Sequence, residues 1–197
     1  MKRRDFIKTL TSGLIAPGLL VSHSASARDQ NAEFWRLASQ GHNLILVRHT
    51  RTHPGIGDPP GFRLDDCQTQ RLLNPQGREE ARKIGEQFHQ ANLKLDRILS
   101  SAWCRCTETA DIAFGRHEVW APINSIFSNR ERGPAQTRAI LQAAASQPPG
   151  ENWILSTHRS NILLATGQNT SMGDVLLTRY SASSPDKLVV MAQLNWR

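Results

Sequence analysis

The chain contains few of the residues that mark several common protein classes. Of its 197 residues, three are cysteines, 6% are aromatic and one is tyrosine. So few cysteines exclude a small scaffold held by several disulfides, and the Cys104-x-Cys106 pair lacks a second pair at the spacing that a zinc site requires. Internal repeats and low-complexity tracts are also missing. The composition therefore indicates an ordinary globular domain and predicts no bound metal.

The positive charge of the chain is scattered along it. The net charge is +7, and the first 27 residues hold four basic residues and one acidic residue, so about +4 remains for the rest. Nucleic-acid binding is not expected, because the basic residues form no stripe and aromatic residues are sparse. A mild attraction for small anionic molecules fits this pattern better.

The chain has no long apolar run. Its first apolar stretch is part of a pattern that is typical of signal peptides. Arg3 and Arg4 precede an aromatic, an aliphatic and a basic residue; an apolar stretch over residues 9–21 follows, and Ala25-Ser26-Ala27 ends it. This order predicts a Tat signal peptide over residues 1–27, cleaved after Ala27. The alternatives are a basic cytosolic tail and an uncleaved anchor, although the stretch is shorter than the about 20 residues of a membrane-spanning helix.

Residues 28–197 are enough for one domain with a sizeable core. No later segment is long and apolar enough for a membrane helix. We therefore expect a single soluble domain in the periplasm or another extracytoplasmic compartment, without stable membrane insertion after cleavage.

Two apolar runs, far apart in the sequence, each end in a histidine. Residues 44–47 lead into Arg48-His49, and residues 153–157 lead into His158. Each run is typical of a short buried strand of a parallel sheet. Open α/β folds place their ligand crevice at the carboxyl ends of such strands, so the two histidines are predicted to meet in one pocket.

A third apolar run, residues 95–99, is followed by Arg105 within the segment 100–110. Two arginines and two histidines at three strand ends would form a compact, cationic pocket that suits a phosphoryl group. Such a pocket needs no cage of acidic residues around a metal.

Strand-like and helix-like segments alternate along the chain, which predicts a three-layer α/β/α sandwich with a mostly parallel central sheet. Asn74 is a good N-cap and Pro75 suits the first position of a helix. A turn-rich loop over residues 53–61 is expected at the mouth of the crevice. The expected helices cover residues 31–39, 75–91, 107–114, 134–145 and 161–165, and the expected strands cover 43–47, 95–99, 153–157, 175–177 and 188–194.

These motifs together resemble the histidine phosphatase superfamily, in the branch that includes the phosphoglycerate mutases. Residues 73–81 are similar to the Leu-Thr-x-x-Gly-x-x-x-Ala helix start of that family, and the likeness covers most of the chain after about residue 40. The small size and the exported context resemble the small periplasmic members of the branch, such as a lipopolysaccharide core heptose phosphatase.

The resemblance implies a role for each residue of the predicted pocket. His49 matches the nucleophile that forms a phosphohistidine, Arg48 and Arg105 match the residues that clamp the phosphate, and His158 matches the second histidine, which donates to it. Thr50 stands where many relatives have glycine, and its hydroxyl would add a donor for the substrate. The resemblance implies no organic cofactor.

In relatives a carboxylic acid that protonates the leaving group often lies between the second arginine and the second histidine. Glu131 is the first choice here, because it lies in a loop-like segment that could reach over the pocket. The other candidates are Glu108, Glu118, Asp65 and Asp66.

The three cysteines lie close in sequence to the predicted pocket segments. In an oxidising compartment Cys67 could pair with Cys104 or with Cys106, leaving one free thiol; the alternative is three free thiols. A bridge would tie the loop after His49 to the segment that carries Arg105.

The sequence thus predicts an exported phosphatase of a small phosphorylated substrate, with sugar phosphates and other envelope phosphates as candidates. A mutase is disfavoured, because phosphoglycerates are cytosolic and the chain lacks the longer insertions of mutases. The alternative is a non-catalytic protein that binds phosphate, or an envelope component, through the same pocket.

Overall fold

A computed structural model describes residues 27–197, with side chains described from residue 29. Its core is a six-stranded sheet with the strand order β3-β2-β4-β1-β5-β6. The four strands from β3 to β1 run parallel to one another, and β5 and β6 add an antiparallel edge. The strands are β1 (Asn43–Arg48), β2 (Arg97–Ser100), β3 (Glu118–Val119), β4 (Asn152–Thr157), β5 (Val175–Arg179) and β6 (Val189–Leu194).

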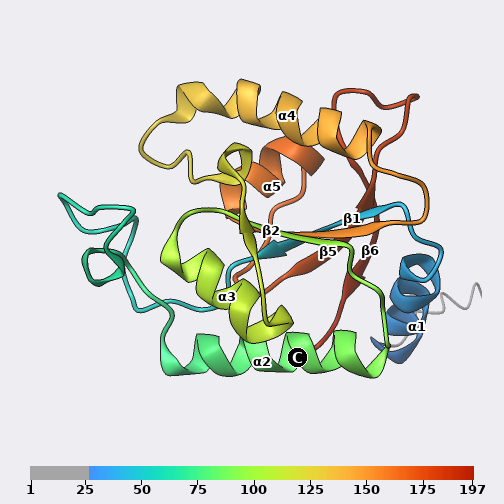
Figure 1. The fold of residues 1–197 in the computed structure, drawn as a ribbon, viewed down its shortest axis with the longest axis horizontal. Helices are drawn as coiled ribbons and strands as arrows, with labels where there is room; N and C mark the ends of the chain where they lie inside the picture. The colour runs from blue at the N-terminus through green and yellow to red at the C-terminus, as the bar shows by residue number, and fades with distance from the viewer. Residues whose placement is uncertain (1–26) are drawn as a thin grey trace, which may run out of the picture.

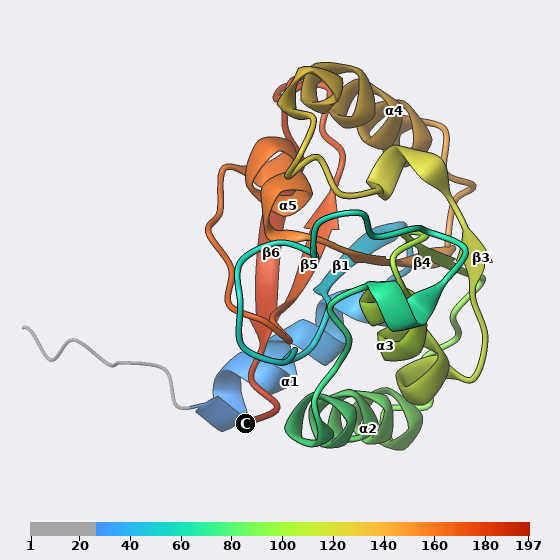
Figure 2. The same cartoon turned by 90° about the vertical axis from the view of Figure 1, so that its left-hand side faces the viewer.

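Helices cover both faces of this sheet (Figures 1 and 2). One face carries α1 (Ala27–Ala38), α2 (Pro75–Gln90) and α3 (Cys104–Phe114), and the other carries α4 (Gly133–Ala145) and α5 (Arg159–Thr166). Short 3-10 helices at Cys67–Thr69, Ala121–Ile123 and Arg130–Arg132 interrupt the loops. This is the predicted three-layer arrangement with a mostly parallel sheet.

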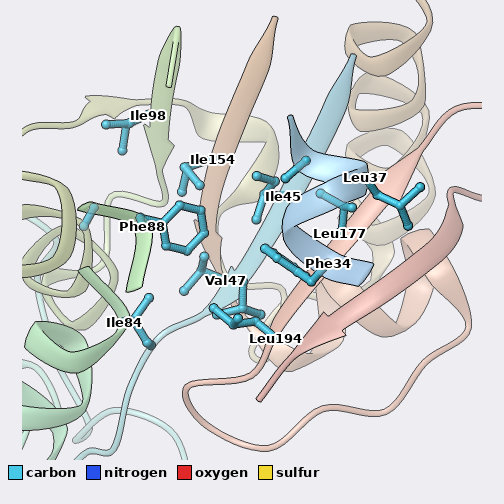
Figure 3. Close-up of a cluster of buried hydrophobic side chains, with 13 residues drawn as sticks. Phe34, Leu37, Ile45, Val47, Ile84, Phe88, Ile98, Ile154, Leu177 and Leu194 are labelled. Carbon is cyan, nitrogen blue, oxygen red and sulfur yellow. The ribbon is translucent and has the colours of Figure 1, made fainter. Parts of the chain in front are cut away.

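The alternation of side chains along β1 builds two separate cores. Ile45 and Val47 pack on the side of α1, α2 and α3, whereas Leu44 and Leu46 pack on the side of α4 and α5. Figure 3 shows the first of these cores, with Phe88 of α2 near the β1 side chains. Both faces of the strand are buried, which explains its uninterrupted apolar sequence.

The structure places most elements where the sequence predicts them. Helix α2 begins at Pro75, and the Asn74 side chain accepts a hydrogen bond from the backbone N–H of Gly77, as an N-cap does. One difference affects the site: α3 begins at Cys104, three residues before the predicted start, so Arg105 lies in the first turn of the helix. The two-residue strand β3 was not predicted, because it is short and exposed.

The sheet order brings the predicted strand ends together. Strands β2, β4 and β1 are neighbours, and in the paired register Arg48 lies opposite Thr157. The residues directly after these strands therefore share one edge of the sheet. The connection from β1 to α2, teal in Figure 1, extends from this edge.

The predicted signal peptide lies outside the described residues, except for its last residue, Ala27, the first residue of α1. Within residues 27–197, no helix combines the length and the apolar character needed to cross a membrane.

Candidate active site

His49 follows β1 and is held in one orientation by the backbone. It is 3% exposed, its N–H bonds to the carbonyl of Thr157, and its Nδ1 lies 2.9 Å from the carbonyl oxygen of Thr50. Because a carbonyl oxygen only accepts, Nδ1 carries the proton and donates it. The other ring nitrogen, Nε2, then keeps its lone pair.

Burial and nearby charge keep this imidazole neutral. Desolvation lowers the pKa of His49 to about 3, and the positive charge of Arg105 acts in the same direction. A neutral ring with a free Nε2 is the form that attacks phosphorus.

His158 follows β4 and lies beside His49, with 5.5 Å between the ring centroids. Its Nε2 is 2.8 Å from the Ser101 hydroxyl and 3.5 Å from the Cys106 thiol. Burial, followed by the charge of Arg105, lowers the pKa of His158 well below its usual value. The structure thus brings together the two histidines that the sequence places at separate strand ends.

Three arginines surround the histidines. Arg48 ends β1, Arg105 lies in the first turn of α3, and Arg71 lies in the segment before α2. The Nε atom of each is buried and has no hydrogen-bond partner among the described residues. Burial is the main cause, and neighbouring arginines a further one, of the lowered pKa of Arg48 and of Arg71. A cluster of positively charged side chains with unpaired hydrogen-bond donors is typical of an anion-binding site.

These groups line one pocket of about 320 Å³. A larger hollow of about 640 Å³ between α1 and β6 shares no residue with it and contains neither histidine. The pocket near the histidines carries the chemistry, so we take it as the candidate site. Its lining consists of Arg48, His49, Gly55, Ile56, Gly57, Arg71, Arg105, Ser125, Phe127, His158, Arg159, Ser160 and Met172.

Asp58 is the carboxylate that holds Arg105. Its Oδ1 lies 2.7 Å from Arg105 Nη1 and accepts from the backbone N–H of Arg71 at 3.1 Å, while its Oδ2 accepts from Trp103 Nε1 at 2.9 Å. The side chains of Asp58 and Arg105 are 7% and 4% exposed. Asp58 therefore fixes the guanidinium beside the histidines, although it is not itself part of the pocket lining.

The structure does not bring Glu131 into the pocket. It lies exposed on the 3-10 helix Arg130–Arg132, outside the pocket lining. The other candidate acids are also engaged elsewhere: Glu108 with Arg78, Glu118 with Arg97, and Asp65 and Asp66 with Arg63. Among the described residues, no carboxylate lines the pocket.

Thr50 is also placed differently from the expectation. Its hydroxyl is buried and lies 3.2 Å from Thr109 Oγ1, to which its backbone N–H donates. The side chain therefore ties the segment after β1 to α3 and is not among the residues that line the pocket.

A disulfide joins Cys67 to Cys104 and leaves Cys106 free and buried. This selects one of the two pairings that the sequence left open. Because Cys104 precedes Arg105, the bridge ties the connection that carries Asp58 and Arg71 to the start of α3. No cluster of metal-ligating side chains occurs over residues 27–197.

Arg71 and Asp58 are among the residues of the site that the sequence did not predict. Both lie in the irregular connection between β1 and α2, where no periodicity places a side chain. The one usable signal is that Asp58 is the sole acidic residue of the turn-rich loop 53–61.

Comparisons with known proteins agree with this geometry. Residues 44–160 match the model of the histidine phosphatase superfamily (branch 1). Over 117 residues the chain is 28% identical to the mitochondrial serine/threonine-protein phosphatase Pgam5 of Drosophila willistoni, a match that covers 59% of this chain and 34% of that protein. The chain thus spans about a third of that relative.

Two solved structures share the fold. A phosphoserine phosphatase mutant of Entamoeba histolytica is 14% identical, with a TM-score of 0.55 over 79% of this chain and 98% of that one. The protein histidine phosphatase SixA is also 14% identical, with a TM-score of 0.53 over 78% and 97% of the two chains. The match to the family model covers more than half of the chain and includes both histidines, so the chain belongs to branch 1 of the histidine phosphatase superfamily.

Proposed function

We propose that the chain is an exported phosphatase that hydrolyses a phosphate monoester through a phosphohistidine at His49. The observation that carries this proposal is the neutral His49 ring, with Nδ1–H bonded to the Thr50 carbonyl, beside three arginines whose Nε–H groups are buried and have no partner among the described residues. This arrangement provides a nucleophile and an anion-binding site in the same pocket.

The reaction takes two displacements. Nε2 of His49 forms a bond to phosphorus while the bond from phosphorus to the ester oxygen breaks, and the electron pair leaves with that oxygen. The departed oxygen takes a proton from solvent water. A water molecule then attacks the phosphohistidine and loses a proton to solvent, the N–P bond breaks, and the electron pair returns to Nε2. In this proposal Arg48, Arg71 and Arg105 stabilise the charge of the transferring phosphoryl group, and His158, which lines the same pocket, donates a hydrogen bond to one of its oxygens.

The test is the release of phosphate from p-nitrophenyl phosphate and from a panel of sugar phosphates in the presence of EDTA. We expect the unaltered protein to hydrolyse these esters and His49→Ala to hydrolyse none. Rapid-quench experiments should detect an acid-labile phosphoenzyme in the unaltered protein and not in His49→Ala. His117→Ala is a matched control, because His117 lies outside the pocket, where it pairs with Asp111.

The lack of a carboxylate among the described lining residues favours a second candidate, a protein that binds phosphate without turning it over. Binding of inorganic phosphate without hydrolysis of any ester would favour this candidate. Hydrolysis of esters by His49→Ala would contradict a phosphohistidine intermediate at His49.

Export is part of the proposal and rests on the order of charged, apolar and small residues at the amino end. We expect the exported protein to begin at Arg28. Replacement of both Arg3 and Arg4 by lysine should keep the precursor in the cytosol. An exported protein whose sequence begins at Met1 would contradict the cleavage.

A further inference from the structure

The mouth of the pocket is apolar, although its base is cationic. Ile56 is 90% exposed and Phe127 is 56% exposed, and both belong to the pocket lining. They come from two different loops that meet here, because a Cβ atom added to Gly57 would lie 2.9 Å from the Phe127 ring. Single exposed apolar side chains are common, but two at one rim form a surface for an apolar ligand.

The pocket offers little to a sugar. Carboxylates and side-chain amides can bind vicinal hydroxyls through two polar atoms, yet among the described residues no Asp, Glu, Asn or Gln lines the pocket, and its side-chain hydroxyls are those of Ser125 and Ser160. Such side chains in neighbouring segments have other partners: Asp58 pairs with Arg105 and accepts from Trp103, while Gln70 and Asn124 accept from the backbone N–H groups of Cys104 and Ala102.

The same lining lacks a proton donor of the carboxylic type for the leaving oxygen. An aliphatic alkoxide is strongly basic and leaves slowly without a proton, whereas a phenol has a pKa of about 10 and its oxygen leaves as the anion. The pocket chemistry therefore favours a leaving group that needs no acid.

We propose that the substrate is an aryl phosphate, the phosphate ester of a phenol, with its ring against Ile56 and Phe127 and its phosphate among the arginines. This rests on the proposed function of the same site. In the first step the N–P bond to His49 forms, the P–O bond breaks with its electron pair on the phenolate oxygen, and the phenolate takes a proton from water after departure. Hydrolysis of the phosphohistidine then follows as described above.

The first experiment compares phenyl phosphate with glucose 6-phosphate and glycerol 3-phosphate as substrates of the full protein. General acids contribute about 10²- to 10⁴-fold to a rate, so without one we expect kcat/KM for phenyl phosphate to exceed both by at least about 100-fold. Hydrolysis of either polyol phosphate within about tenfold of phenyl phosphate would overturn the proposal.

The second experiment separates recognition of the ring from leaving-group chemistry. Phenylphosphonate cannot be hydrolysed, and burial of its ring should make it bind at least about tenfold more tightly than methylphosphonate, as measured by calorimetry. Ile56→Ser and Phe127→Ser should reduce this ratio. Leu64→Ser is the matched control, because Leu64 is 43% exposed in the same connection but lies outside the pocket lining.

The two experiments distinguish the possible failures. Equal affinities for the two phosphonates would overturn aryl recognition even if esters turn over. Tighter binding of phenylphosphonate without hydrolysis of any ester would support aryl recognition and contradict the phosphatase.

Discussion

At the scale of single residues, the site depends on keeping two histidines uncharged among arginines. Protonation of His49 would add a positive charge to a buried group that already faces Arg105 and Arg48. The Thr50 carbonyl fixes the remaining proton on Nδ1. The surroundings therefore select the nucleophilic form of the ring before any substrate binds.

This state of the ring is directly measurable. We expect two-dimensional ¹⁵N NMR of the phosphate-free protein to show His49 as the neutral Nδ1–H tautomer throughout pH 5 to 8, because burial holds its pKa at about 3. His49→Gln assigns the signals. A titration of His49 with a midpoint near 6.5, the usual value for histidine, would contradict this environment.

The buried pair of Asp58 and Arg105 supports a second residue-scale prediction. In Asp58→Asn the guanidinium loses its counter-charge, which should lower the free energy of unfolding by about 3 kcal/mol. Inorganic phosphate should restore part of this stability, because it supplies negative charge to the same arginine cluster. Urea unfolding with and without phosphate checks both effects.

Asp65→Asn is the control for this prediction, since Asp65 is 85% exposed and pairs with Arg63 on the surface. If phosphate does not reduce the loss of stability in Asp58→Asn, Asp58 stabilises the fold and is not the counter-charge of the arginine cluster in the pocket.

At the scale of elements, the connection between β1 and α2 supplies part of the pocket lining and the carboxylate that holds Arg105. It carries Asp58, Arg71 and Ile56, and it contains little regular structure apart from one short 3-10 helix. Its position depends on contacts with α3, of which the Cys67–Cys104 disulfide is the covalent one.

Removal of this disulfide should affect both stability and binding. The bridge spans 37 residues, and a loop of that length corresponds to a loss of about 4 kcal/mol on reduction in the chain-entropy model. In Cys67→Ser/Cys104→Ser we expect this loss in urea unfolding, together with a raised KM, because Arg71 is less well held. An unchanged KM in the double variant would contradict the role of the bridge in positioning Arg71.

The sequence predicts those elements whose pattern determines their burial. His49 and His158 could be located because each follows a strand that is apolar on both faces. The start of α3 was wrong by three residues, because Cys104, Arg105 and Cys106 show no helical pattern of their own and are buried by tertiary contacts. Arg71 and Asp58 lie in irregular chain, where only the folded contacts determine which side chains face the pocket.

At the scale of the whole molecule, the catalytic chemistry and the stability of the fold are linked through pH. In the folded state both histidines stay neutral at pH values well below the usual histidine pKa. In the unfolded chain each histidine titrates near pH 6.5. Above pH 6.5 neither state binds these protons, so the stability is fully present. As the pH falls below 6.5, only the unfolded state takes them up, and the folded state is destabilised.

We therefore expect the free energy of unfolding to decrease as the pH is lowered from 7 to 5, by about 2 kcal/mol for His49, with a further loss in the same direction from His158. Urea unfolding at constant ionic strength measures the slope. In His49→Gln/His158→Gln the slope between pH 7 and pH 5 should become nearly flat, because the groups that take up the protons are gone. The same slope in the protein and in the double variant would show that other groups govern the acid sensitivity, and that the two histidines are not held neutral by the fold.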